Sequence, residues 1–427
     1  MKDAFVSVSC QEKSPLWQQG IQRSSALYPR GNDIRSEFER DYTRILHSEA
    51  YRRLKHKTQI FFAPQNDHVC TRMEHVAHVT SVAATITKYL GLNQQLATAI
   101  ALGHDIGHPP FAHAGEECLN SLLKQKEGKN APKKFWHQRN GLFFADYIET
   151  LQDPEEQAKN LDLTYAVRDG ILSHSSSGLS SSSRGDTYHA SIVLPNGLKP
   201  RKEAIDLYEI SQASSLQPFT WEGCVVKLAN IIAYIGRDIE DARRYQILDM
   251  GGYRQLQEIV ASCFGFTVGK TVNTTVLIND LIVDLCQQSS PETGLLFSSE
   301  YYKFIQELIN FNASHIYNHW RLEEFKHYAF NIIKTIYRTL MQSYPFVQNR
   351  KTRLALKQYP RLSVSFENWL VKYTSYDPQQ KERLRFSHIP AVFDISDRES
   401  YEKCVIEYIS GMTDQFAIAV HGEIISF

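Results

Sequence analysis

Residues 102–117 concentrate side chains that can bind metal ions and transfer protons. They read LGHDIGHPPFAHAGEE, with His104 next to Asp105. An imidazole beside a carboxylate joins a good ligand for divalent metals to an oxygen donor for hard cations. His108 and His113 would then be available for proton transfer or for contact with phosphate. An isolated His-Asp pair is more often a buried histidine bonded to a carboxylate, but a cluster of this density favours a functional site.

A His-Asp pair supplies too few ligands to hold a metal, so other segments must contribute. Upstream, His75 continues into Val79, Val82 and Ile86 at helical spacing, which places its imidazole on the buried face of a helix. A core histidine bonded to a backbone carbonyl would show the same spacing. The position of His75 is therefore suggestive only in combination with other segments.

Downstream, residues 225–242 are predicted to form one helix with an apolar face and a polar stripe. The polar stripe consists of Asn230, Tyr234, Asp238 and Asp241, while the apolar face carries Leu228, Ile232, Ile235 and Ile239. Such a stripe either faces water or forms a wall that binds sugar hydroxyls, since Tyr and Asp one turn apart suit that contact. The spacing alone leaves these two alternatives level.

Five separated blocks together carry a family resemblance. They are residues 40–61 (RDYTRILHSEAYRRLKHKTQIF), 71–79 (TRMEHVAHV), 104–116 (HDIGHPPFAHAGE), 232–242 (IAYIGRDIEDA) and 405–417 (VIEYISGMTDQFA). In their order and spacing, the chain resembles the deoxyguanosine triphosphate triphosphohydrolase-like branch of the HD-domain superfamily. The resemblance runs from about residue 35 almost to the end of the chain.

The resemblance implies a metal site with one unusual ligand. His75, His104 and Asp105 match the family's first three ligands, and Asn230 stands where the fourth, normally Asp, is expected. An amide oxygen brings no charge, so we expect weaker metal affinity. The implied cofactor is a divalent ion: manganese, magnesium or another transition metal. Asp238 and Asp241, one or more turns away, are candidates to compensate for the lost charge.

The resemblance also implies roles for further residues. The implied set is His113, Glu116 and His137 for proton transfer, Gln59, Tyr234 and Asp238 for contact with deoxyribose, and Arg72 and His108 for contact with phosphate. His113 is the expected general acid, because the departing 5′-oxygen of a nucleoside needs a proton. Arg53 and Lys55 are expected as additional cations beside the triphosphate.

The implied reaction is metal-dependent hydrolysis of a dGTP-like deoxynucleoside triphosphate to the deoxynucleoside and inorganic triphosphate. A second interpretation is a catalytically weakened HD protein that binds nucleotide or single-stranded nucleic acid as a regulator, because Asn230 replaces the expected Asp. A third is an HD phosphohydrolase acting on nucleoside monophosphates or cyclic nucleotides. The blocks around residues 57–61 and 232–242 favour the triphosphohydrolase over this third interpretation.

Composition fits a soluble cytoplasmic protein. Lys plus Arg and Asp plus Glu balance at 47 each, so no global basic field points to nucleic acid. The seven cysteines show no C-x-x-C spacing, which disfavours a disulfide framework and a zinc ribbon. No apolar run approaches the ~20 residues of a membrane span. The absence of a glycine-rich phosphate loop disfavours a P-loop or dinucleotide-binding fold.

We therefore expect a mainly α fold with an HD-domain helical core and additional C-terminal helices. The predicted divisions are an N-terminal segment (1–30), the HD catalytic core (31–270) and a helical C-terminal region (271–427), assembled as a homo-oligomer. The helix carrying His104 should end near His108, because Pro109 and Pro110 break it before His113. Residues 173–187 are expected to be a flexible loop, and a short strand pair is predicted near residues 195–197. His174, at the edge of the loop, is within reach of the substrate in one interpretation, but a histidine in such a place is more often exposed.

Overall fold

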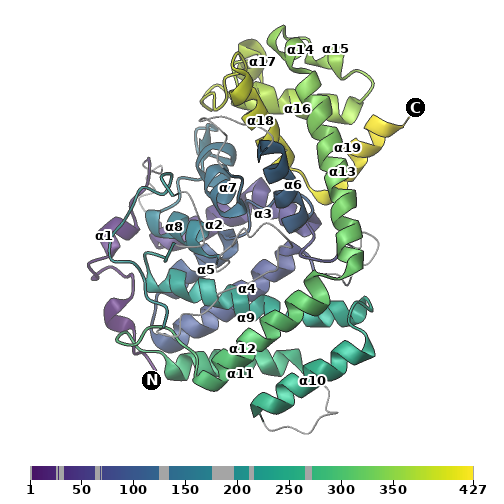
Figure 1. Ribbon diagram of the computed structural model, residues 1–427. Coiled ribbons are helices and arrows are strands. Elements are labelled where there is room, and N and C mark those ends of the chain that lie inside the picture. Colours follow the sequence, from purple (N-terminus) through teal and green to yellow (C-terminus); the bar gives the residue numbers. More distant parts are fainter. Residues whose placement is uncertain are drawn as a thin grey trace.

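The structure is a computed structural model that describes residues 2–25, 27, 33–62, 68, 70–124, 134–175, 197–210, 216–264 and 272–426. Within these ranges the protein is mainly α-helical, as predicted, and its sheet consists of two short antiparallel strands (Figure 1). The strands β1 and β2 pair Thr150 with Asn160 and Gln152 with Ala158.

The elements up to the long helix α9 form the part of the molecule that carries the predicted site. In chain order they are η1 (Val6–Val8), α1 (Trp17–Gly20), α2 (Glu37–His47), α3 (Glu49–Arg53), η2 (Leu54–His56), α4 (Arg72–Leu90), α5 (Gln94–Gly103), α6 (Ala112–Lys124), α7 (His137–Phe143), η3 (Phe144–Ile148), β1 (Thr150–Gln152), β2 (Ala158–Asn160), α8 (Tyr165–Ser173) and α9 (Trp221–Arg244).

The remaining elements are helical, as expected for the C-terminal region. They are α10 (Met250–Phe264), α11 (Thr274–Gln288), α12 (Ser299–Asn312), η4 (Ala313–Tyr317), α13 (Trp320–Gln342), α14 (Tyr344–Gln348), α15 (Thr352–Ala355), α16 (Pro360–Tyr373), α17 (Pro378–Arg383), α18 (Arg398–Ser410) and α19 (Asp414–Ile425).

Helices α4, α5 and α9 pack against one another at the centre of the molecule (Figure 1). α4 starts at a capping box, in which the Thr71 side chain accepts from the Glu74 amide and the Glu74 side chain accepts from the Thr71 amide. It ends at Gly91, whose φ of 77° is the left-handed C-cap conformation that glycine adopts without strain. These local signals fix where α4 begins, and hence where His75 lies.

α9 confirms the helix predicted for residues 225–242 and extends it at both ends. Its apolar side chains Leu228, Ile232, Ile235 and Ile239 are all buried. On the other face, Asp238 and Asp241 are also buried, while Asn230 and Tyr234 are half-buried. The polar stripe therefore faces the interior of the protein and not open solvent.

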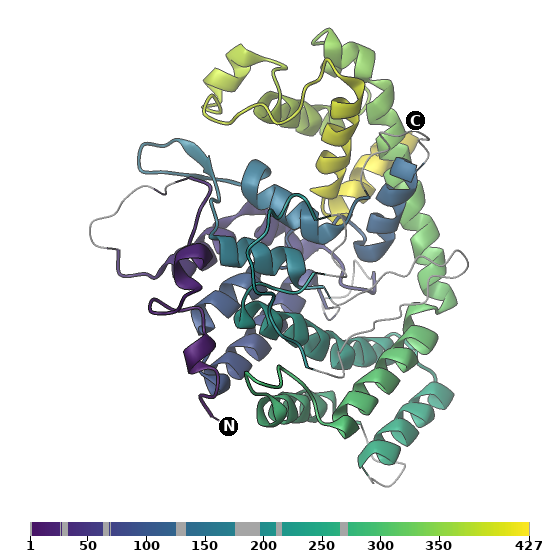
Figure 2. The same cartoon turned by 60° about the vertical axis from the view of Figure 1, so that its left-hand side comes forward.

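The C-terminal helices close over the core on one side. α13 runs along the molecule and packs against α6, α18 and α19 (Figures 1 and 2). One continuous hydrophobic cluster includes Ile232 of α9, Leu308 of α12 and Val405 of α18. The division of the chain near residue 270 stays a prediction.

The segment around the His-Asp pair differs from the prediction. α5 ends at Gly103, five residues before His108, and residues 104–107 form turns instead of a fourth helical turn. The cause is local: the His104 imidazole bonds the Ala101 carbonyl at 2.7 Å, which would otherwise accept the Asp105 amide. His113, predicted to follow a turn, lies in the first turn of α6.

Two loop predictions fall largely outside the described residues. Residues 176–187 of the serine-rich loop and 195–196 of the predicted strand pair are not described. Leu198, just beyond them, forms an isolated antiparallel bridge with Leu295.

Candidate metal and catalytic centre

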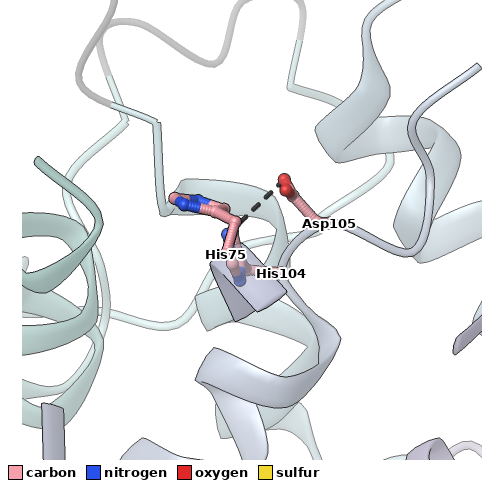
Figure 3. A group of neighbouring side chains, drawn as sticks. All are labelled: His75, His104 and Asp105. Carbon is pink, nitrogen blue, oxygen red and sulfur yellow. Dashed lines mark ion pairs between the residues drawn. The ribbon is translucent and has the colours of Figure 1, made fainter. Parts of the chain in front are cut away.

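Figure 3 shows three candidate metal ligands converging: His75 from the first turn of α4, and His104 and Asp105 from the turn that directly follows α5. One donor atom from each of the three side chains lies within 4.8 Å of the others, and all three residues are buried. The packing of α5 against α4 thus brings together residues that are about 30 positions apart in the sequence.

The protonation of these groups suits a cation. Burial lowers the pKa of His75 to about 3, so its imidazole is neutral. Burial alone would raise the pKa of Asp105, but the neighbouring His104 and Arg72 outweigh it and hold this pKa well below its usual range. Neutral imidazoles and an ionised carboxylate are the forms in which these side chains ligate metals.

His104 is oriented in the way typical of a ligating histidine. A carbonyl oxygen only accepts hydrogen bonds, so Nδ1 carries the proton that bonds Ala101 O. In the neutral form of this tautomer, Nε2 carries a lone pair; it is buried and makes no hydrogen bond, although Asp105 Oδ1 lies 3.5 Å away. An orphaned buried acceptor costs free energy unless something fills the site, and a divalent cation would do so.

Asn230 lies at this site, as the sequence predicted. Its Oδ1 is 2.9 Å from His75 Nε2, so α9 adds an amide oxygen beside the imidazole. Asp238 and Asp241 do not belong to any of the clusters of potential metal-ligating side chains found among the described residues. The donor set of two imidazoles, one carboxylate and one amide oxygen fits a divalent ion with reduced ligand charge.

Arg72 joins the metal side to the expected phosphate position. One of its guanidinium nitrogens, Nη1, donates to Asp105 Oδ2 at 2.7 Å, while Nε and Nη2 are buried without a hydrogen-bond partner. A guanidinium with unsatisfied buried donors beside a metal site is suited to bind an anion. The role of Arg72 as a phosphate contact stays a prediction.

The second group of titratable residues lies beside the first. His108 Nε2 is 3.2 Å from Asp105 Oδ1, and the rings of His108 and His137 stack with centroids 3.7 Å apart. His137 reaches this place because α7 approaches the turn after α5 very closely: a Cβ on Gly107 would lie 2.0 Å from the amide nitrogen of Gly141. A glycine at position 107 is required for this contact.

Glu116 connects the other two predicted proton-transfer residues, His113 and His137. Its Oε2 accepts from His137 Nδ1 at 2.8 Å and lies 3.8 Å from His113 Nδ1. Burial would raise the pKa of Glu116, but His137 and His113 outweigh burial and hold it well below its usual range, so the side chain is anionic. The His113 side chain is 49% exposed, unlike the buried His108 and His137.

The side chains predicted to contact deoxyribose line the same part of α9 and the segment before α4. Burial raises the pKa of Asp238 to about 8, and its Oδ2 accepts a 2.6 Å hydrogen bond from Tyr317. Gln59 follows Thr58, which bridges to Thr71 at the start of α4, and its Oε1 is buried without a hydrogen-bond partner. Gln59 thus offers a ligand a polar atom without a partner, and Asp238 offers a carboxyl group that already accepts one hydrogen bond.

The two basic residues expected beside the triphosphate differ in their surroundings. Arg53 pairs with Glu149 at 2.8 Å, and Lys55 is exposed. Lys57 is the buried member of this basic run, and its ammonium donates to the carbonyls of His108 and Ser410. The helical register of α3 and η2 decides which of these cations points inward. A run of basic residues in the sequence does not reveal that register.

Sequence reasoning missed two residues of the site. His174, expected to be exposed, is buried at the end of α8, and its ring lies edge-on to that of His104 with centroids 4.9 Å apart. Like His104, it bonds a carbonyl three residues earlier, that of Ile171. Tyr317 belongs to η4, far away in sequence. The repeated helix-end histidine was a usable signal for His174, whereas nothing in the sequence marked Tyr317.

Comparison with known proteins agrees with this geometry. The sequence profile of the HD domain family matches residues 72–216. A deoxyguanosinetriphosphate triphosphohydrolase-like protein of Caldanaerobacter subterraneus subsp. tengcongensis is 30% identical over 392 residues, which cover 92% of this chain and 86% of that protein. The chain belongs to the deoxyguanosinetriphosphate triphosphohydrolase-like family. It is a metal-dependent phosphohydrolase of the HD-domain class.

Two other members of this family are similar in sequence to this chain. A deoxyguanosinetriphosphate triphosphohydrolase-like protein of Rickettsia bellii is 29% identical over 418 residues, covering 92% of each chain. One of Clostridium tetani is 41% identical over 217 residues, covering 51% of this chain and 49% of that protein. No helix in the described ranges is long and apolar enough to cross a membrane.

Proposed function

We propose that the protein hydrolyses deoxynucleoside triphosphates of the dGTP type at the α-phosphorus and releases the deoxynucleoside with intact inorganic triphosphate. One observation carries the proposal: α9 presents Asn230 to the metal site and, two turns further on the same face, the buried Asp238. A single rigid helix would thus set the distance between the reacting phosphate and the sugar.

Substrate binding is assigned to groups on both sides of the metal site. Arg72 offers the unsatisfied Nε and Nη2 donors to phosphate oxygens. His108 lies beside Asp105, and because its Nε2 faces that carboxylate, its unpartnered Nδ1 would donate to phosphate only when both ring nitrogens carry protons. Asp238 and Tyr234 would face the deoxyribose, with Asp238 accepting a hydrogen bond from the 3′-hydroxyl. Gln59 would add its side-chain amide to the same sugar.

The chemistry that a divalent ion supplies when held by His75, His104, Asp105 and Asn230 is Lewis acidity, which activates water and polarises the phosphoryl oxygen. The remaining work is done by the protein. Arg72 stabilises the negative charge that spreads over the triphosphate during displacement. The buried walls around His104 and His108 exclude bulk water from this charge.

We assign His113 as the general acid that protonates the departing 5′-oxygen. Its partial exposure leaves the imidazole accessible to substrate, and the anionic Glu116 lies beside it. His137 donates to the same carboxylate and so fixes the direction in which Glu116 faces. The 3.8 Å separation of His113 and Glu116 is of the kind that shortens when substrate binds.

Asn230 supports a second candidate function, a nucleotide-binding or single-stranded nucleic acid-binding regulator with weak turnover. An uncharged fourth ligand lowers the charge available to hold a cation. The two candidates differ in one observable. A regulator binds dNTP or single-stranded nucleic acid without product formation even at saturating metal, whereas the hydrolase forms product.

Isotope labelling in ¹⁸O-water tests the proposed reaction. Attack on the α-phosphorus places the label in inorganic triphosphate and leaves the deoxynucleoside unlabelled. Mass spectrometry of both products, after reactions with each dNTP and with Mn²⁺ or Mg²⁺, distinguishes this from attack at other positions. Labelled pyrophosphate, phosphate or nucleoside monophosphate would contradict the proposal.

Two further expectations, a homo-oligomeric assembly and a cytoplasmic location, stay predictions of the sequence. A third question, whether a second nucleotide acts as effector, is one that the sequence leaves open. Light scattering of the purified protein tests the first, and dNTP titrations that show sigmoidal turnover test the third.

A further inference from the structure

The C-terminal helix α19 contacts the active-site turn through one carboxylate. Asp414, at the first position of α19, is buried, and its two oxygens accept from two different segments of the core. Oδ1 accepts the Phe111 amide at 2.8 Å, and Oδ2 accepts the Thr58 amide at 2.9 Å. Phe111 lies in the turn that precedes His113, and Thr58 precedes Gln59.

This turn needs an external support. Phe111 and Ala112 both have left-handed backbone conformations, with φ of 63° and 55°. Consecutive non-glycine residues in this region cost free energy and persist only where surrounding contacts enforce them. Pro109 and Pro110 have no amide hydrogens with which to stabilise the turn. The Phe111 amide is therefore a principal point at which the turn can be held.

Lys57, the residue before Thr58, holds the other end of the turn. The buried Lys57 donates from its ammonium to the carbonyl of His108 and, at 3.1 Å, to the carbonyl of Ser410. Ser410 ends α18, just before α19 begins. Lys57 and Asp414 thus connect residues 108–111 to the C-terminal segment 410–414, with one contact at each end of the turn.

We propose that Asp414 is a positioning residue for hydrolysis: it enforces the turn at residues 108–112 and thereby places His108 and His113 relative to the metal site. Asp414 touches neither substrate nor metal in this assignment. The expected change in kcat rests on the proposed function. The expected change in hydrogen–deuterium exchange of the turn does not. The block at residues 405–417, one of the five that carried the family resemblance, thus has a physical role in the catalytic centre.

The test compares Asp414→Asn and Asp414→Ala with the wild-type chain. Asn keeps one carbonyl oxygen but turns an NH₂ group toward the second amide, so it should be intermediate. Because a misplacement of about 1 Å can cost about 10²-fold in rate, we expect kcat to fall by about 10-fold to 100-fold in Asp414→Ala. KM and the bound metal per chain should stay within about 3-fold, since Arg72 and His75 are held by α4, Asn230 by α9, and His104 and Asp105 follow directly on α5.

Hydrogen–deuterium exchange supplies a readout that needs no activity. Asp414→Asn should accelerate exchange in peptides covering residues 105–115, with no change in peptides from α4. Lys57→Met, which keeps the aliphatic stem and removes the donor, should accelerate exchange in the same peptides. If the wild-type chain hydrolyses no dNTP, the proposed function fails, but these exchange rates still decide the positioning role.

Glu222→Gln is the matched control. Glu222 is also a buried carboxylate at the start of a helix that accepts two backbone amides from separate segments, those of Cys10 and Asn93, each at 3.0 Å. The Glu222→Gln variant should have a lower melting temperature than the wild-type chain, with unchanged kcat and unchanged exchange at residues 105–115. An Asp414→Asn variant with unchanged kcat and unchanged exchange in the turn would overturn the proposal, as would equal effects of Glu222→Gln.

Discussion

The metal side and the proton-transfer side of the site are built differently. His75, His104 and Asp105 are buried, and His104 and Asp105 are each oriented by a protein group, the carbonyl of Ala101 or the guanidinium of Arg72. His113 is half exposed and lies 3.8 Å from its carboxylate partner. The candidate ligands are thus fixed by core packing, whereas the proposed proton donor follows a turn and is half exposed.

The largest effect is expected on the metal side. Asp105→Ala removes the only carboxylate of the ligand set and leaves the buried Arg72 without its ion-pair partner. Loss of Lewis acidity worth several kcal/mol corresponds to a fall in kcat of about 10³-fold or more. Metal analysis should show loss of the bound ion. Asp397→Ala, at an exposed helix cap, should retain both metal and rate; retained metal in Asp105→Ala would contradict the assignment.

His113→Ala separates the two sides. Loss of a general acid should lower kcat by about 10²-fold to 10⁴-fold, while metal content and dNTP affinity are kept. Because His113 is half exposed, added imidazole should restore part of the rate, whereas it should not rescue His104→Ala, whose side chain is buried. Steady-state kinetics with an imidazole titration measure this difference. An unchanged rate in His113→Ala would refute its role.

Asn230→Asp tests the unusual ligand. A second carboxylate restores the charge that the family normally has at this position, so metal affinity should rise by about tenfold. Titration of the metal-free protein with Mn²⁺, followed by calorimetry, measures the change, and Asn279→Asp on α11 serves as a control for added charge. Unchanged affinity would show that the amide does not weaken the site.

The smallest effect concerns pH and the sugar side. The pKa of Asp238 is about 8 in the folded protein because of burial, compared with about 4 in an unfolded chain. The folded state thus holds this proton more tightly, and its stability falls as pH rises from about 4 to 8. Asp238→Asn should flatten this part of the dependence of the melting temperature on pH. Identical pH profiles for wild type and variant would contradict the shifted pKa.

The sequence predicted those parts of the molecule that depend on local periodicity and on recognised motifs. His75 lies on the buried stripe of α4, and the polar stripe of α9 is one continuous face. Neither of these two predictions required knowledge of the tertiary structure, since the spacing of apolar residues at 3.6 per turn specifies which side of a helix is buried. Spacing left open whether the α9 stripe met solvent, and only the packing of α9 against α4 and α5 resolved that question.

Parts that depend on contacts between distant segments escaped prediction. Tyr317 reaches Asp238 from a position 79 residues away, and Asp414 reaches Phe111 across 303 residues. The early end of α5 has a different cause, since the His104 side chain competes with the backbone for one carbonyl. Helix propensity does not encode such competition, because it depends on the side-chain conformation that the folded core selects.

A cation held by His75, His104, Asp105 and Asn230 should support release of intact triphosphate. This is measured by incubating the purified chain with dGTP and Mn²⁺, quenching with chelator, and separating the products by anion exchange. We expect deoxyguanosine and inorganic triphosphate in equal amounts, and no product when the metal is removed. Unchanged dGTP at saturating Mn²⁺, or dGMP with pyrophosphate, would contradict this expectation.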